Sequence, residues 1–241
     1  MVEPIADGNF YQLISHEALA VIFSLVAAYV LFALVFGFVS FWRDSGEKLS
    51  DLNDFAAVSI AVKDVLRLAY LDSDGWGCAY PGEKTSQLRK WFHHFTFYGF
   101  LLCFAATTVG AFYHFVFHWS APYSYASLPV VLGTLGGIGL LIGPAGLLLL
   151  KTRRNRDISD EKKYEMDIAF IALIILISLT GLLLLVLRET SAMGALLIVH
   201  LGFVMTLFVM IPYGKFIHSV YRFAALLKYA LERKRKQILG V

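Results

Sequence analysis

Residues 200–218 read HLGFVMTLFVMIPYGKFIH, an apolar stretch with a histidine at each end. On one helix, at about 100° per residue, eighteen residues make about five full turns, so His200 and His218 project from the same face. At about 1.5 Å per residue they lie about 27 Å apart, close to the thickness of a bilayer's hydrocarbon core. Pro212 lies between them, and a bend there changes their relative direction. The stretch predicts a membrane span with one imidazole near each surface.

Histidines in such positions favour one function and allow a simpler one. Ionisable side chains inside a membrane are costly and are usually functional. Imidazole is a common axial ligand of haem iron, and two haems stacked across a membrane need a histidine near each surface. The alternative is that both histidines are interfacial groups at the ends of a span. This pair alone leaves both interpretations open.

The composition fixes the class of protein. Hydrophobic residues make up 58% of the 241 residues, and the mean hydropathy is +0.67, far above that of a soluble domain. Each apolar run is long enough to cross a bilayer as a helix. The runs cover about residues 17–41, 92–117, 127–150, 168–188 and 193–217. We predict an all-α integral membrane protein, a five-helix bundle that forms a single domain over residues 1–241.

Basic residues predict the orientation, because cytoplasmic loops are enriched in Lys and Arg. The loop 43–90 contains seven, the loop 151–163 six and the tail 215–236 seven, whereas the opposite side carries only Arg188. The N-terminus is therefore predicted outside and the C-terminus inside. The net charge of +3 reflects this bias and does not indicate nucleic-acid binding, although the tail is suited to contact membrane lipids.

The inner loop 43–91 contains an amphipathic segment. Residues 50–71 place apolar side chains near helical spacing, and Ser50 is a candidate N-cap. Such a helix either docks a soluble partner or lies on the lipid surface without one.

The second span supplies histidines that match those of the last. His93 and His114 are three heptads apart, which keeps them on nearly one face about 31 Å apart. Antiparallel placement of the two spans then predicts an inner ligand pair, His93 with His218, and an outer pair, His114 with His200. His94 is the alternative to His93, although on an ideal helix it points roughly 200° away from His114.

Two further histidines are alternatives for the outer site. They are His118, just beyond the end of the second span, and His16, at the start of the first. Each is more simply explained as an interfacial group. The glycine-rich stretch 133–146, GTLGGIGLLIGPAG, either packs closely against another helix or offers a flat surface to a macrocycle.

Several long blocks carry a resemblance to known proteins. Residues 77–114, GCAYPGEKTSQLRKWFHHFTFYGFLLCFAATTVGAFYH, resemble the membrane part of the tricarballylate-utilisation or citrate-utilisation protein B family. So do 127–151, SLPVVLGTLGGIGLLIGPAGLLLLK, and 10–16, FYQLISH. The stretch 200–218 resembles the final helix of nitrate reductase gamma subunits, whose two histidines there bind haem.

This resemblance implies a b-type cytochrome of the bacterial inner membrane. It implies that electrons pass from a flavin-dependent tricarballylate dehydrogenase, through an iron–sulfur protein or domain on the cytoplasmic face, to the quinone pool. The family normally has a ferredoxin-like region and an additional span, and we expect neither within these 241 residues. With only Cys78 and Cys103, too few thiolates for a four-cysteine cluster, we expect no iron–sulfur cluster in this chain.

We therefore predict a di-haem b electron-transfer subunit of a quinone-linked oxidoreductase, with iron held by His93, His114, His200 and His218. The rival interpretation is a haem-free transporter or transporter accessory subunit with proton-relay histidines. Against it, the spans carry no obvious Asp/Glu pair and no convincing inverted repeat. A third interpretation is a structural anchor with vestigial ligands.

Overall fold

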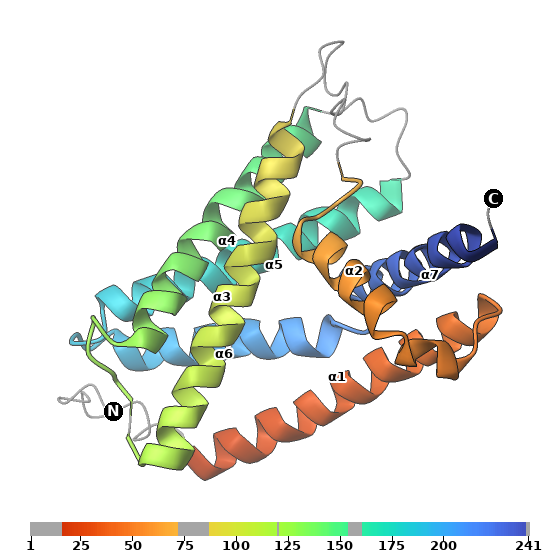
Figure 1. Cartoon of the computed structure of the whole chain (residues 1–241). Coiled ribbons are helices and arrows are strands. Elements are labelled where there is room, and N and C mark those ends of the chain that lie inside the picture. The colour runs from red at the N-terminus through yellow and green to blue at the C-terminus, as the bar shows by residue number, and fades with distance from the viewer. Residues whose placement is uncertain (1–15, 72–86, 120, 154–160, 240–241) are drawn as a thin grey trace. The chain divides into compact units, whose positions relative to one another are not determined.

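A computed structural model describes residues 16–71, 87–119, 121–153 and 161–239 of the chain (Figure 1). Every regular element in these ranges is helical. In chain order the elements are α1 (His16–Asp44), the short 3₁₀ helix η2 (Leu49–Asn53), α2 (Phe55–Leu66), α3 (Leu88–Phe117), α4 (Leu128–Thr152), α5 (Glu161–Val186), α6 (Met193–Met210) and α7 (Ile217–Leu239).

Five of the described helices are long and apolar enough to cross a membrane: α1, α3, α4, α5 and α6. They coincide with the five predicted runs, so the prediction of an all-α protein with five spans is confirmed by length and composition. The first four agree with their predicted bounds within about four residues, whereas the fifth ends at Met210 instead of 217.

The last span is not a continuous helix to His218, and the prediction of one helix with both histidines on one face is wrong. Helix α6 ends two residues before Pro212, which has no backbone N–H to donate to the preceding turn. The amides of Tyr213 and Gly214 instead donate to the Met210 carbonyl, at 3.1 and 2.8 Å. A new helix, α7, then begins at Ile217, so the five-turn relation between the histidines does not apply.

The chain divides into two compact units, and each is described here by itself. The first comprises residues 1–23 and 76–207, and the second comprises residues 24–75 and 208–241. Whether the membrane part functions as the single predicted domain stays a prediction.

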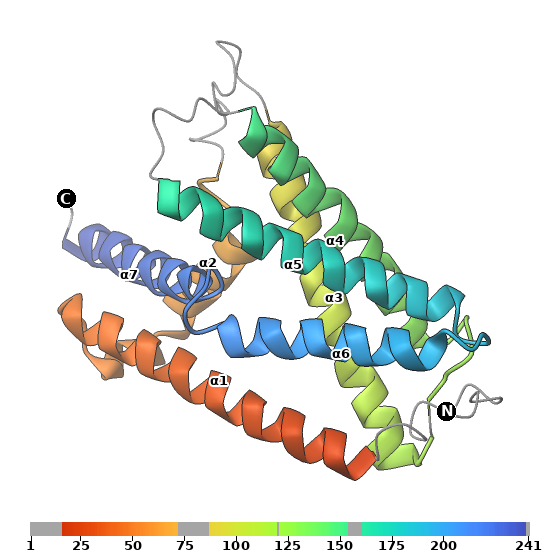
Figure 2. The same cartoon turned by 180° about the vertical axis from the view of Figure 1, so that it is seen from behind.

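Within the first unit, α3 packs along α4, and α5 lies against α4 (Figures 1 and 2). Glycines allow the close approach of α3 and α4. A Cβ on Gly99 would lie 2.9 Å from the carbonyl oxygen of Gly136, and one on Gly143 would lie 2.5 Å from the amide nitrogen of Thr96. The α4 residue Gly137 faces Leu182 of α5 instead. The glycine stretch is therefore a helix-packing surface, and the interpretation as a macrocycle platform fails because α3 covers it.

Interactions at the two ends of the first unit tie neighbouring helices together. At one end, Arg188 donates to the carbonyl of Tyr123 at 2.7 Å and lies 3.5 Å over the ring of Tyr125. At the opposite end, Lys151 of α4 forms an ion pair with Asp167 of α5. The short turns that precede α4 and follow α5 therefore share one end, as an antiparallel arrangement requires.

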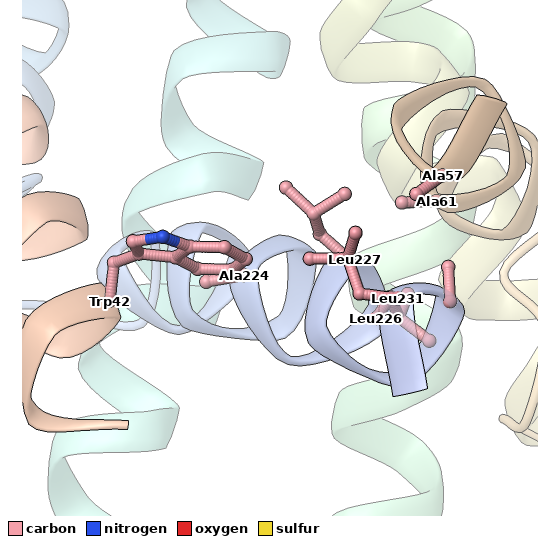
Figure 3. Close-up of a cluster of buried hydrophobic side chains, with 8 residues drawn as sticks. Trp42, Ala57, Ala61, Ala224, Leu226, Leu227 and Leu231 are labelled. Carbon is pink, nitrogen blue, oxygen red and sulfur yellow. The ribbon is translucent and has the colours of Figure 1, made fainter. Parts of the chain in front are cut away.

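The second unit packs the end of α1 against α2 and α7. Trp42 is fully buried, and Figure 3 shows it over Ala224 of α7. The same cluster holds small residues of α2 against leucines of α7, and its remaining buried members are Ala57, Ala61, Leu226, Leu227, Ala230 and Leu231. The Trp42 indole also donates to the Lys48 carbonyl at 2.9 Å, which fixes the turn that follows α1.

Helix α2 is shorter than the predicted 50–71 segment, and its N-cap is not Ser50. The carboxylate of Asp54 accepts a hydrogen bond from the amide of Ala57 at 3.1 Å and so caps the helix. Ser50 belongs to η2, one turn earlier. An aspartate at the N-cap is as favourable as a serine, so the sequence alone did not distinguish the two.

Candidate functional site

Helix α3 presents one face to α4, and His93 does not lie on it. The face toward α4 carries Phe92, Thr96, Gly99 and Cys103, which lie against the glycines of α4. His93 follows Phe92 by one residue, so it lies about 100° around the helix from this face. On an ideal helix His114, three heptads further along, lies about 60° from His93, back toward the direction of Thr96. Both imidazoles are partly buried and lie within two turns of opposite ends of α3.

His94 occupies a different position. Its Nδ1 contacts the carbonyl of Lys90 at 2.8 Å, and its ring packs 6.0 Å from the rings of Trp91 and Tyr98. These aromatic contacts account for the residue structurally. An Nδ1–H bonded to a backbone carbonyl is also common in metal-binding histidines, so His94 stays an alternative to His93.

His200 has the most specific surroundings of the candidate ligands. Its Nδ1 lies 3.0 Å from the hydroxyl of Thr180 on α5. That hydroxyl also lies 2.7 Å from the carbonyl oxygen of Leu176, one turn earlier in its own helix. Because a hydroxyl has one proton, donating it to the carbonyl makes the oxygen an acceptor for Nδ1–H. This arrangement favours the His200 tautomer with its proton on Nδ1 and a lone pair on Nε2.

His218 lies on α7, in the second unit. The neighbouring Ile217 packs beside Gly37 of α1, where an added Cβ would lie 3.3 Å from its Cδ1 atom. Gly37 is seven residues, or about 10 Å of helix, before the end of α1 at Asp44. His218 therefore lies level with the last two turns of α1, on a helix that is separate from α6. Its Nδ1 contacts the carbonyl of Lys215.

The remaining alternatives have different surroundings. His118 is exposed, has a left-handed backbone conformation with φ of +56°, and ends α3 as its C-cap. The side chain of His16 and all of Cys78 lie outside the described residues.

The ligand pairs themselves stay predictions. His114 and His200 both belong to the first unit, whereas His93 and His218 belong to different units. Among the described residues, no three His, Cys, Asp or Glu side chains form a group that could hold a metal ion. A haem iron needs only two axial ligands from the protein, and a neutral imidazole with a free Nε2 lone pair is suitable. His200 fits this requirement.

Sequence reasoning missed the groups around His200. Thr180 and Gly181 lie in an apolar span, and neither forms a recognisable motif. The one available signal is the presence of a hydroxyl and a glycine side by side in an otherwise aliphatic run.

Five helices long and apolar enough to cross a membrane are typical of a multi-pass α-helical membrane protein. The family model of citrate utilization protein B matches residues 2–238, and the chain belongs to this family. It is similar to citrate utilization protein B of Escherichia coli, with 47% identity over 243 aligned residues. That alignment covers 100% of this chain and 63% of the relative, so the chain spans less than two thirds of the relative's length. No solved structure matches the chain.

Proposed function

We propose that this chain is the haem b membrane subunit of a quinone-linked dehydrogenase in the bacterial inner membrane. It passes electrons from a cytoplasmic iron–sulfur protein or domain, itself served by a flavin-dependent dehydrogenase, to the quinone pool. The dehydrogenase oxidises tricarballylate or a related tricarboxylate. The printed name of the relative, citrate utilization protein B, supports a role in the use of tricarboxylates.

The observation that carries the proposal is the state of His200. Its imidazole lies in an apolar span, and its Nδ1 lies 3.0 Å from the Thr180 hydroxyl, an arrangement that favours a lone pair on Nε2, which iron needs. A proton-relay histidine has no requirement for one fixed tautomer, whereas an iron ligand does. The haem-free transporter is therefore the weaker interpretation.

Four histidines would hold the two haems. His114 and His200 form the proposed outer site, and His93 and His218 the inner one. When bound, haem iron alternates between ferric and ferrous states and so carries one electron at a time. The polypeptide orients the imidazoles and would tune ligand basicity through the Nδ1 contacts of His200 and His218.

The second unit offers a docking surface for the electron donor. Helices α2 and α7 run antiparallel, since Lys234 pairs with Asp54 at one end and Arg222 donates to the Ala69 carbonyl at the other. Lys228 donates to the carbonyl of Ser45, just after α1 ends. Helix α7 continues eleven residues past Lys228, so the start of α2 lies beyond the end of the span.

Phe55 is the first residue of α2 and is 83% exposed. It lies beside the part of α7 that extends past the end of α1. Val62 and Leu66 are exposed further along the same helix. This apolar surface supports docking of the iron–sulfur protein over simple contact with the membrane surface.

Haem content tests the proposal directly. A pyridine haemochrome assay on the purified, folded protein is expected to give about two haem b per chain, because four histidines supply two bis-imidazole sites. A folded preparation without haem contradicts the proposal and favours the haem-free transporter. A ratio near one means that one pair is wrongly assigned.

Histidine variants test the assignment of each site. Replacing His114 or His200 with alanine should remove one redox component in a potentiometric titration, and replacing His93 or His218 should remove the other. His118→Ala is the matched control, because this exposed C-cap histidine should leave both components in place. His94→Ala should also keep both, and loss of the inner component in that variant instead would exchange the roles of His93 and His94. Loss of the same component in all four ligand variants contradicts the pairing.

The docking surface is tested by Phe55→Asp, with Phe55→Leu as the conservative control. The charged variant should lower dehydrogenase-to-quinone turnover while the haem spectrum stays unchanged, and the leucine variant should keep most of the turnover. Equal turnover in both variants would mean that α2 only lies at the membrane surface.

A further inference from the structure

Two buried polar side chains stand out in α5 among the described residues, Ser178 and Thr180. Ser178 donates to the carbonyl of Ile174 at 3.0 Å, a bond within its own helix that satisfies the hydroxyl. Thr180 makes the equivalent bond to Leu176 and a second contact, to Nδ1 of His200. The bond to Leu176 already satisfies the buried Thr180 hydroxyl, so its contact with His200 on α6 is not needed to compensate for burial.

Gly181, the next residue of α5, lies against the same imidazole. An added Cβ there would lie 3.0 Å from Cε1 of His200, 3.6 Å from Nδ1 and 3.8 Å from Nε2. The edge of the ring that carries both nitrogens thus packs over the α-carbon of Gly181. An alanine at this position forces the ring to move by a few tenths of an ångström.

We propose that Thr180 and Gly181 are positioning residues for His200 as an iron ligand. The Thr180 hydroxyl keeps the proton on Nδ1, and Gly181 leaves the space that sets the ring's orientation. This inference rests on the proposed function and adds to it a device on α5 that tunes one haem. When the Thr180 hydroxyl accepts the hydrogen bond from Nδ1–H, the imidazole becomes a stronger electron donor to iron. A stronger donor stabilises the ferric state.

The test compares variants that remove only this bond. Thr180→Val removes the hydroxyl at nearly constant shape, and Thr180→Ser restores it. Ser178→Ala is the matched control, because it removes a buried hydroxyl of the same helix that bonds only to its own backbone. Gly181→Ala probes the space, and Gly202→Ala is its control, because an added Cβ there meets no atom within 4 Å.

Thr180→Val should keep two haems while shifting the redox equilibrium of one of them toward the ferrous form. The expected change is up to about tenfold, which is about 59 mV for a one-electron couple. The low-spin ferric signal of the same haem should shift in electron paramagnetic resonance. Thr180→Ser and Ser178→Ala should match the wild type in both measurements. Gly181→Ala should alter that signal, and Gly202→Ala should not.

Each contrary outcome overturns a different statement. If the wild-type protein holds haem that His200→Ala removes, but Thr180→Val keeps the wild-type potential and signal, the positioning role is wrong and the proposed function stands. If the wild-type protein holds no haem, both are wrong. If Thr180→Val does not fold, the comparison of Gly181→Ala with Gly202→Ala decides, and identical signals overturn the inference.

Discussion

The contact between α3 and α4 can be tested at a single atom, by the substitution Gly143→Ala. The added Cβ would lie 2.5 Å from both the amide nitrogen and the hydroxyl oxygen of Thr96, and 2.6 Å from the carbonyl oxygen of Phe92. Two of these three atoms belong to the backbone of α3, so a side-chain rotation cannot relieve the clash. Ordinary contacts of a Cβ atom begin near 3.4 Å, so the two helices must separate by nearly 1 Å at this point.

The cost follows from that separation. A gap of 0.5–1 Å forfeits about a quarter to a half of the dispersion energy of the atoms involved. Overpacking of a tight core typically costs about 1–3 kcal/mol, and a backbone clash belongs at the upper end of this range. We therefore expect Gly143→Ala to lower the free energy of unfolding by about 2–3 kcal/mol, a change of about thirtyfold or more in the equilibrium constant.

Gly133→Ala is the control on the same helix. Its Cβ would lie 3.6 Å from Cβ of Ala106, an ordinary contact, and alanine is the better helix former. Unfolding of the purified protein in mixed detergent micelles measures both variants. Equal stability of Gly143→Ala and Gly133→Ala would refute the close packing of these helices. Because His93 follows Phe92 on α3, Gly143→Ala should also reduce haem retention.

Two further predictions concern the second unit. The ammonium of Lys234, 2.5 Å from Asp54, together with the Ala57 amide, holds the pKa of this carboxyl below its usual 3.8. The stabilisation of α2 by this cap should therefore be fully present above pH 3.8 and be lost as the pH falls through the lower pKa of the folded state. Hydrogen exchange of the α2 amides measures this loss. Asp54→Asn should show no such pH dependence. Trp42→Ala should lower the free energy of unfolding by about 3–5 kcal/mol because the side chain is fully buried, whereas Trp42→Phe should lower it much less. Denaturation in detergent measures both variants. Similar losses of stability in the two would contradict the packing of Trp42.

The sequence predicted the spans well because length and hydropathy alone determine them. The sequence did not predict where the last span ends, because that end depends on a single missing hydrogen-bond donor. The missing N–H of Pro212 ends α6, and the run of apolar residues through Ile217 conceals the break. The glycines of α4 left two interpretations open, because their spacing does not say whether a helix or a macrocycle lies against them.

Helical spacing in the sequence could not predict which side chains contact the histidines from other helices. Thr180 is twenty residues from His200 and lies on a different helix, so only the fold brings the two together. The shared face of His93 and His114 that heptad spacing predicts is a relation internal to one helix, and it stays a prediction.

This difference between local and tertiary contacts sets an expected order of haem loss. The Nδ1 atom of His218 contacts a carbonyl three residues earlier in sequence, so that ring is oriented by its own segment. The orientation of His200 depends instead on α5. Partial separation of the helices should therefore disturb the site of His200 first. Potentiometric titration at increasing denaturing-detergent fractions should show early loss of the redox component that His200→Ala removes. Earlier loss of the component that His218→Ala removes would mean that local contacts do not protect the inner site.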